Sequence, residues 1–179
     1  MSAVKQAKFI RDSLPADGLF AGQSWRIASA PFPLGAELAQ EIESLGRVLL
    51  QFYRAVNLLY RKSAEAKMPA WVANWLDLGK PAELIAWQRS SAFKNDVPRV
   101  IRPDLLITED GLRVTELDSV PGGIGVTAWL NKTYSAINHQ LSTTLLGGAD
   151  GMLRGFASIF GDAKQVQIIV SEEAAAYRP

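Results

Sequence analysis

The feature that most limits the fold of this chain is an apolar stripe of helical period between residues 37 and 66. Its members lie three or four residues apart: Leu38, Ile42, Leu45, Leu49, Phe52, Val56 and Leu59. Glutamates and arginines occupy the other faces of the same segment. This pattern predicts one long amphipathic helix that buries the stripe against other elements. We interpret the aromatic residues Phe52, Tyr53 and Tyr60 as core and interface packing and not as a binding site.

Shorter helices are expected on both sides of the long one. Pro69 opens a segment that contains Trp71 and Trp75, and Pro81 opens the next, which contains Trp87. Proline in the first turn of a helix and glycine past its end are the usual boundary residues. Together with a short helix at residues 3–14, these segments predict a helical N-terminal region over residues 1–96.

The composition excludes several classes of site. The chain has 179 residues, no cysteine, a single histidine (His139) and a formal net charge of +1. A chain without thiols has no disulfide scaffold, cysteine zinc site or cysteine nucleophile. The near-zero net charge gives no electrostatic case for nucleic acid or an anionic membrane as a partner. No apolar run is long enough for a membrane span or a signal peptide, so we expect a cytoplasmic protein.

The pattern changes near residue 97. Residues 100–108 and 112–118 have strand period and many β-branched side chains, and Glu109-Asp110-Gly111 between them predicts a β-hairpin. Further elements are expected after the hairpin: helices at 126–138 and 150–160, a buried strand at 165–170, and a helix that begins at Ser171. The chain is therefore expected to be α+β, with an α/β region over residues 97–179.

The predicted hairpin gathers charged residues on one face. A three-residue loop that ends in glycine sets Thr108 opposite Leu112 and, further from the turn, Asp104 opposite Glu116 and Arg102 opposite Asp118. Because side chains alternate between the two faces of a strand, the four charged residues share one face. The other face is apolar and is expected to pack on helices; it carries Ile101, Leu105, Ile107 and Leu117.

Three neighbouring carboxylates repel one another, and a single arginine offsets only part of that repulsion. A divalent cation would stabilise such a cluster, and carboxylate oxygens suit Mg²⁺ or Mn²⁺. An adjacent arginine would then face a phosphate, which a guanidinium can bind with two parallel hydrogen bonds. The alternative interpretation is that these residues are ordinary surface charges on a solvated hairpin.

The segment after the hairpin is rich in glycine. Pro121-Gly122-Gly123-Ile124-Gly125 leads directly into a predicted helix. Glycines let backbone amides approach a ligand closely, and a helix N-terminus favours anions. Gly122, Gly123 and Gly125 are therefore candidate phosphate-binding residues, with a sharp strand-to-helix turn as the alternative explanation.

The segment over residues 99–125 resembles the motif of circularly permuted ATP-grasp proteins, of which the glutathionylspermidine synthetases are one group. In that family Arg-x-Asp is followed by Glu-x-Asn, and the matching residues here are Arg102-Pro-Asp104 and Glu116-Leu-Asp118. The resemblance implies that Asp104, Glu116 and Asp118 hold Mg²⁺ ions that bind ATP phosphates. It also implies that Arg102 stabilises the acyl-phosphate and tetrahedral intermediates. Asp118 departs from the family pattern, because asparagine is usual at that position.

The resemblance implies an incomplete ATP-grasp-like fold, since the lysine-bearing, adenine-binding part of the permuted family lies further along the chain. We therefore expect these residues to be the N-terminal part of an ATP-dependent carboxylate–amine or carboxylate–thiol ligase, inactive alone. Its expected partners are ATP, a small carboxylate, an amine, and the remainder of the polypeptide. Two alternatives remain open. One is a non-catalytic module that binds an anion or a partner protein, and the other is an interaction domain with a tryptophan-rich helical interface.

Overall fold

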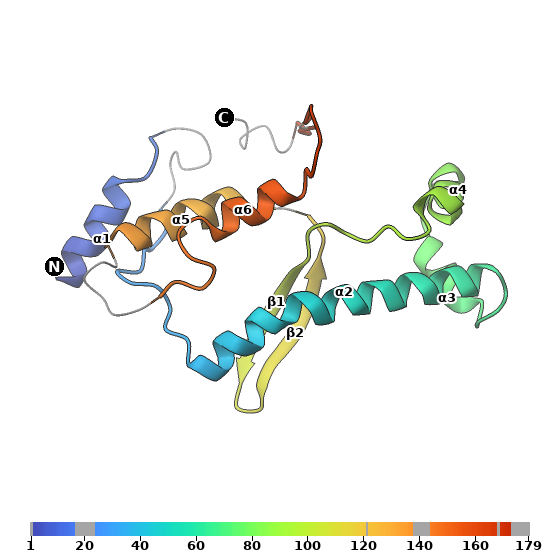
Figure 1. The fold of residues 1–179 in the computed structure, drawn as a ribbon, viewed down its shortest axis with the longest axis horizontal. Coiled ribbons are helices and arrows are strands. Elements are labelled where there is room, and N and C mark those ends of the chain that lie inside the picture. Colours follow the sequence, from blue (N-terminus) through green and yellow to red (C-terminus); the bar gives the residue numbers. More distant parts are fainter. Residues whose placement is uncertain (1, 17–23, 121, 138–143, 168, 173–179) are drawn as a thin grey trace. The chain divides into compact units, whose positions relative to one another are not determined.

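The fold combines helices with an antiparallel β-hairpin, which confirms a mixed α+β structure (Figure 1). The computed structural model describes residues 2–16, 24–120, 122–137, 144–167 and 169–172. The chain divides into two compact units, one formed by Gly35–Val120 and the other by Met1–Leu34 with Pro121–Pro179. The change of pattern near residue 97 thus lies within one unit. None of the described helices combines the length and the apolar character that crossing a bilayer requires.

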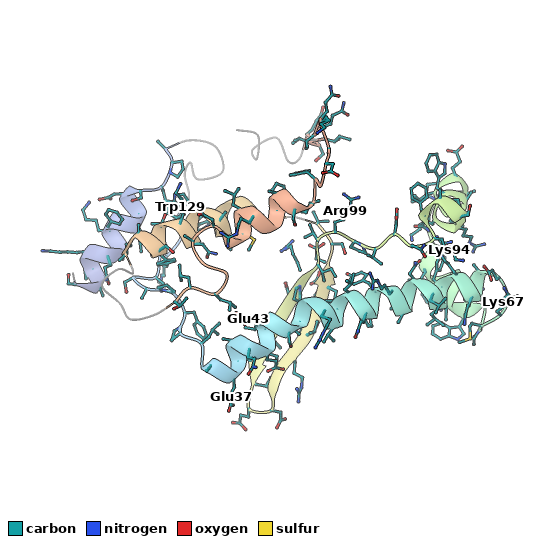
Figure 2. The ribbon with its side chains drawn as sticks, viewed as in Figure 1. Glu37, Glu43, Lys67, Lys94, Arg99 and Trp129 are labelled. Atoms are coloured by element: carbon teal, nitrogen blue, oxygen red, sulfur yellow. The ribbon has the colours of Figure 1, made fainter. Side chains whose placement is uncertain are left out.

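The long helix predicted from the apolar stripe is present as α2 (Ala36–Ala64) in the unit Gly35–Val120. Leu49 and Tyr60 are each only 8% exposed, so this part of the helix packs as expected. Phe52, by contrast, keeps 51% of its surface exposed. Glu37 and Glu43 lie on the exposed faces of the helix, as the stripe predicts (Figure 2).

The two tryptophan-containing helices follow α2 in the same unit. They are α3 (Trp71–Asp77) and α4 (Ala82–Arg89), and a short 3₁₀ helix, η2 (Ser91–Phe93), comes next. Gly79 has φ +77°, a left-handed conformation that glycine adopts without strain, and it lies in the turn between the two helices. The tryptophans on α3 and α4 are 63–69% exposed, so within this structure they are surface residues.

Ser63 joins the end of α2 to the start of α3. Its side chain is buried, its hydroxyl donates to the carbonyl of Pro69 at 2.6 Å, and the amide of Ala73 donates to the same hydroxyl at 3.0 Å. One side chain therefore satisfies two backbone groups, one in the connecting loop and one in α3.

Ser63→Ala is expected to lower the free energy of unfolding of this unit by about 1–3 kcal/mol, because the buried amide of Ala73 loses its acceptor. Ser44→Ala is the matched control, since the exposed Ser44 hydroxyl donates to the carbonyl of Glu41 in its own helix and bonds to nothing else in the described part of the chain. Urea unfolding of both variants gives the comparison. An equal loss of stability in the two would contradict the role assigned to Ser63.

Arg61 joins α2 to the end of α4. Its NH2 group donates to the carbonyl of Gln88 at 2.9 Å, and its NH1 group donates to the carbonyls of Arg89 and Ser90, both at 3.3 Å. These carbonyls lie at the C-terminus of α4, where acceptors lack donors within the helix and where the helix dipole favours a cation. The guanidinium therefore acts as a cap supplied by another helix.

Asp77 anchors a cluster between the three helices. It accepts hydrogen bonds from Tyr60 at 2.7 Å and from Arg89 at 2.5 Å, and its side chain is 10% exposed. Burial tends to raise the pKa of Asp77, but the hydrogen bonds from Tyr60 and Arg89 outweigh it and hold that pKa below its ordinary value. Hydrogen bonds with Tyr60 and Asp77 raise the pKa of Arg89. The cluster is therefore an ionised, hydrogen-bonded pair at the centre of the helical end.

The helix α2 lies along the hairpin of its own unit. Tyr53 Oη lies 3.1 Å from Ser119 Oγ, at the open end of the hairpin. Near the turn, a Cβ added to Gly111 would lie 3.8 Å from Glu41 Oε2. Leu105 and Leu117 are half-buried, whereas Ile107 is 55% exposed. The predicted apolar face of the hairpin is therefore covered only in part within this unit.

The other unit contains the helices α1 (Ala3–Asp12), α5 (Ile124–Ile137) and α6 (Gly151–Ser158), close to the predicted bounds. Ile10 on α1 is fully buried. Tyr134 on α5 donates to the carbonyl of Ala28 at 2.9 Å, and burial raises the pKa of this tyrosine.

The strand predicted at residues 165–170 is wrong for the residues that the structure describes there. Residues 165–167, 169 and 170 are not in a strand, and Ile169 is 96% exposed. β-branched residues favour a strand only where a neighbouring strand pairs with their backbone, and the described part of this unit holds no such neighbour. The helix predicted from Ser171 falls mainly on residues outside the described ranges, as does His139.

Candidate metal and phosphate site

The candidate site lies at the open end of the hairpin formed by β1 (Arg102–Thr108) and β2 (Gly111–Asp118). The strands pair antiparallel, with Arg102 opposite Asp118 and Asp104 opposite Glu116. This part of the predicted register is confirmed. The four candidate residues therefore form two cross-strand pairs, with the Pro103–Leu117 pair between them.

The turn differs from the prediction by one residue. Glu109 and Asp110 alone form it, and Gly111, with φ +95°, lies opposite Thr108 where Leu112 is predicted. A β-bulge between Asp104 and Leu105 then shifts the register by one residue. Because of this bulge, the pairs between it and the open end of the hairpin, Asp104–Glu116 and Arg102–Asp118, are the predicted ones. With a two-residue turn and no bulge, Glu116 and Asp118 would lie on the face opposite to Asp104.

Asp118 is bound at both of its carboxylate oxygens. Arg102 NH1 donates to Oδ2 at 2.8 Å, and the amide of Val120 donates to Oδ1 at 2.8 Å. The same NH1 donates to the carbonyl of Val120 at 3.1 Å. The side chains of Arg102 and Asp118 are 39% and 34% exposed, so the pair contributes little to stability and mainly orients the guanidinium.

The carboxylates of Asp104 and Glu116 are exposed, and neither takes part in an ion pair within the described residues. In the ranges that the structure describes, no group of three acidic or histidine side chains is arranged to hold a metal ion. Two carboxylates nevertheless match what Mg²⁺ commonly takes from a protein, with water and phosphate as its other ligands. Asp118 also keeps free lone pairs, since a carboxylate offers about four acceptor sites. The donor set therefore fits the ion.

Gly122, Gly123 and Gly125 belong to the other compact unit. Gly123 has φ +72°, and its carbonyl accepts both the amide and the hydroxyl of Thr127 in the first turn of α5. A Cβ at Gly123 or Gly125 would meet nothing within 4 Å. The positive φ explains glycine at position 123, whereas no close neighbour within the described residues requires glycine at position 125. Pro121 lies outside the described residues.

Two contacts of this site were not predicted from the sequence. Tyr53 on α2 contacts Ser119, and the backbone of Val120 binds both Arg102 and Asp118. A short aspartate side chain often accepts from the amide two residues later, so the Asp118–Val120 contact had a local signal. The contact between Tyr53 and Ser119 had none. Comparisons with models of protein families, with curated proteins and with solved structures find no match for this chain.

Proposed function

We propose that this chain supplies the hairpin that faces Mg²⁺ and phosphate in an ATP-dependent carboxylate–amine or carboxylate–thiol ligase of the circularly permuted ATP-grasp type. Such an enzyme phosphorylates a carboxylate with ATP, and a nucleophile then displaces phosphate from the acyl phosphate. The observation that carries the proposal is the pairing of Arg102 with Asp118 beside Asp104 and Glu116. The remainder of the polypeptide would supply the adenine site, and the reaction would take place in the cytoplasm.

Arg102 is the electrostatic catalyst in this proposal. Asp118 and the carbonyl of Val120 engage its NH1 group, which restricts how the guanidinium can turn. Arginine carries five N–H donors in a planar fork, so donors remain for phosphate oxygens. A positioned cation stabilises charge that develops on the transferred phosphoryl group and on the tetrahedral oxygen.

Asp104 and Glu116 would hold the metal ion, with Asp118 as a further ligand. When bound, Mg²⁺ neutralises the phosphate charges of ATP and orients them. Asp118 carries one more negative charge than the asparagine usual in the family, and its pairing with Arg102 compensates that charge. The backbone amides of Gly122, Gly123 and Gly125, in the other unit, are separately proposed to bind phosphate.

Mn²⁺ tests the metal site directly, because it takes the same ligands as Mg²⁺ and is paramagnetic. In NMR spectra of the 179-residue chain, Mn²⁺ is expected to broaden the amides near Asp104 and Glu116 first. The double variant D104N/E116Q is expected to weaken binding about tenfold or more, since both charged ligands are lost.

The matched control is E109Q/D110N at the turn of the same hairpin, which removes the same two charges from the same residue types. It is expected to leave Mn²⁺ affinity nearly unchanged. Equal weakening by the two double variants, or broadening centred on the turn, would show non-specific attraction and would contradict the site.

The second candidate function is a non-catalytic module that binds an anion or a partner protein. The hydrogen bonds to both oxygens of Asp118 favour it, because they leave Asp118 fewer lone pairs for a metal ion than an unpaired carboxylate has. ATP consumption by the intact protein with candidate acids and amines separates the two functions. A ligase should also lose turnover with Arg102→Lys, which keeps the charge and removes the guanidinium fork.

A further inference from the structure

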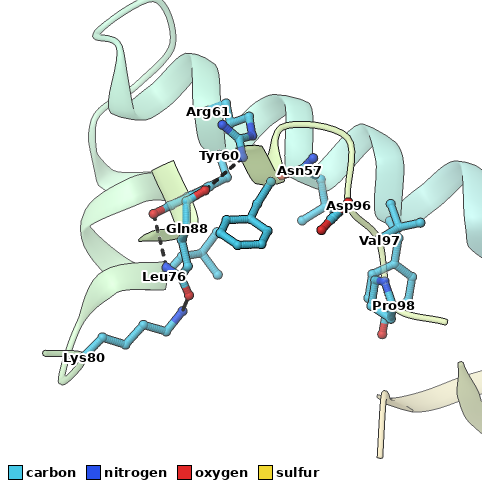
Figure 3. A pocket seen from close by; sticks show the side chains of 12 residues that line it. Asn57, Tyr60, Arg61, Leu76, Lys80, Gln88, Asp96, Val97 and Pro98 are labelled. Carbon is cyan, nitrogen blue, oxygen red and sulfur yellow. Dashed lines mark hydrogen bonds between the residues drawn. The ribbon is translucent and has the colours of Figure 1, made fainter. Parts of the chain in front are cut away.

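The helical end of the unit Gly35–Val120 contains an open pocket that the proposed ligase does not use. Its volume is about 320 Å³, the size of sites that hold small organic molecules. The helices α2, α3 and α4 and the segment after η2 supply its lining (Figure 3). Its apolar wall includes Tyr53, Val56, Tyr60, Leu76, Phe93 and Val97. No residue of β1 or β2 lines it.

The cations around this pocket have acceptors within the chain, although one donor of Arg61, its buried Nε, forms no hydrogen bond within the described residues. Arg61 binds three backbone carbonyls at the end of α4, and Arg89 pairs with Asp77 behind the wall. Lys80 donates to Gln88 Oε1 at 3.0 Å. A ligand anion would therefore have to compete with contacts that hold the helices together.

The acceptors on the other side of the pocket are free. Within the described residues, the carboxylate of Asp96 forms no hydrogen bond or ion pair, and Figure 3 places it across the pocket from Lys80. Asn57 donates through Nδ2 to the carbonyl of Lys94 at 3.0 Å, which fixes its amide and leaves Oδ1 as an acceptor. An available carboxylate and an amide oxygen thus border an aromatic wall.

We propose that this pocket binds a small organic cation, a primary ammonium group carried on an aromatic or branched apolar body. The ammonium would donate to Asp96 and Asn57 Oδ1, and the body would contact Tyr53, Tyr60 and Phe93. Aromatic faces attract cations, and the exposed carboxylate of Asp96 adds a charge of the opposite sign at the edge of the apolar wall. The pocket contains none of the residues proposed to bind metal or phosphate, although Tyr53 in its wall also contacts Ser119 beyond the end of β2.

Calorimetric titration of the 179-residue chain with three probes of similar shape tests the proposal: 2-phenylethylammonium, 2-phenylethanol and 3-phenylpropanoate. The cation is expected to bind at least about tenfold more tightly than the alcohol or the acid, a difference of about 1.4 kcal/mol. Asp96→Asn should reduce the affinity for the cation about tenfold. Asp96→Glu, which keeps the charge, should reduce it less.

Asp110→Asn is the matched control, since it makes the same chemical change at the exposed hairpin turn and should leave affinity unchanged. Circular dichroism confirms that each variant is folded. The proposal is overturned if Asp96→Asn binds the cation as well as the parent chain does, or if the alcohol or the acid binds equally well. Equal affinity for 1,4-diaminobutane, which has no aromatic or branched body, would overturn the role of the apolar wall.

Discussion

Arg61→Met is expected to release the end of α4 from α2 and to reduce the protection of residues 82–90 against hydrogen exchange by about 2–3 kcal/mol. Methionine keeps an apolar stem that can pack in place of the arginine stem, but it donates no hydrogen bond. The carbonyls of Gln88, Arg89 and Ser90 would then lose their charged donor at a helix C-terminus. Capping of this kind stabilises a helix most where the acceptors are shielded from water.

Hydrogen exchange measured by mass spectrometry gives the comparison segment by segment, which suits a chain with two compact units. Arg54→Met is the matched control, because Arg54 is an exposed residue on the same helix. We expect that control to change the protection of α4 by less than about 0.5 kcal/mol. Uniform loss of protection across α2 and α4 in Arg61→Met would mean that Arg61 supports the whole unit and does not act as a local cap.

Asp77→Asn is expected to destabilise the contact between α3 and α4 by about 2–3 kcal/mol at pH 7, since the carboxylate accepts from Tyr60 and from Arg89. The stability of this contact should also depend on pH, because it requires the ionised form of Asp77. The pKa of Asp77 in the folded chain lies below its ordinary value of 3.8. The ionised Asp77 therefore contributes its full stabilisation when the pH is above the pKa that this carboxyl has in the unfolded chain. That stabilisation is lost as the pH falls below this value and then through the lower pKa of Asp77 in the folded chain.

Urea unfolding at pH 7 and at pH 3, followed by tryptophan fluorescence, measures this dependence, because Trp71, Trp75 and Trp87 lie on the two helices concerned. Asp77→Asn should lose less stability between these pH values than the parent chain does. Asp110→Asn, at an exposed position, should behave like the parent. A parent chain and an Asp77→Asn variant with the same pH dependence would rule out Asp77 as a contributor to acid unfolding.

Local pattern was sufficient to predict most of the helices. The apolar stripe between residues 37 and 66 marked α2 to within about two residues, and Pro69 and Pro81 lie close to the starts of α3 and α4. These signals are local, because helical hydrogen bonds form between residues near in sequence. The strand expected at 165–170 was wrong for the described residues for the opposite reason, since a strand depends on a partner elsewhere in the chain.

The pocket near Asp96 could not be predicted either. It depends on Arg61 and Tyr60 of α2 meeting Gln88 and Asp77 of later helices. Nothing in the spacing of these residues indicates that contact. Of these residues only Tyr60 was interpreted from the sequence, as core and interface packing.

For the candidate site, the sequence by itself determined which residues are available: Arg102 and Asp104 in one run of strand period, Glu116 and Asp118 in the next, and a loop at Glu109-Asp110-Gly111 between the runs. Tertiary structure decided that they share one face. A two-residue turn alone would have placed Glu116 and Asp118 on the side opposite to Asp104, and the bulge between Asp104 and Leu105 brings them back. The reason is that side-chain direction alternates with every residue of a strand, so a register change of one residue reverses the face, and pairing between strands sets that register.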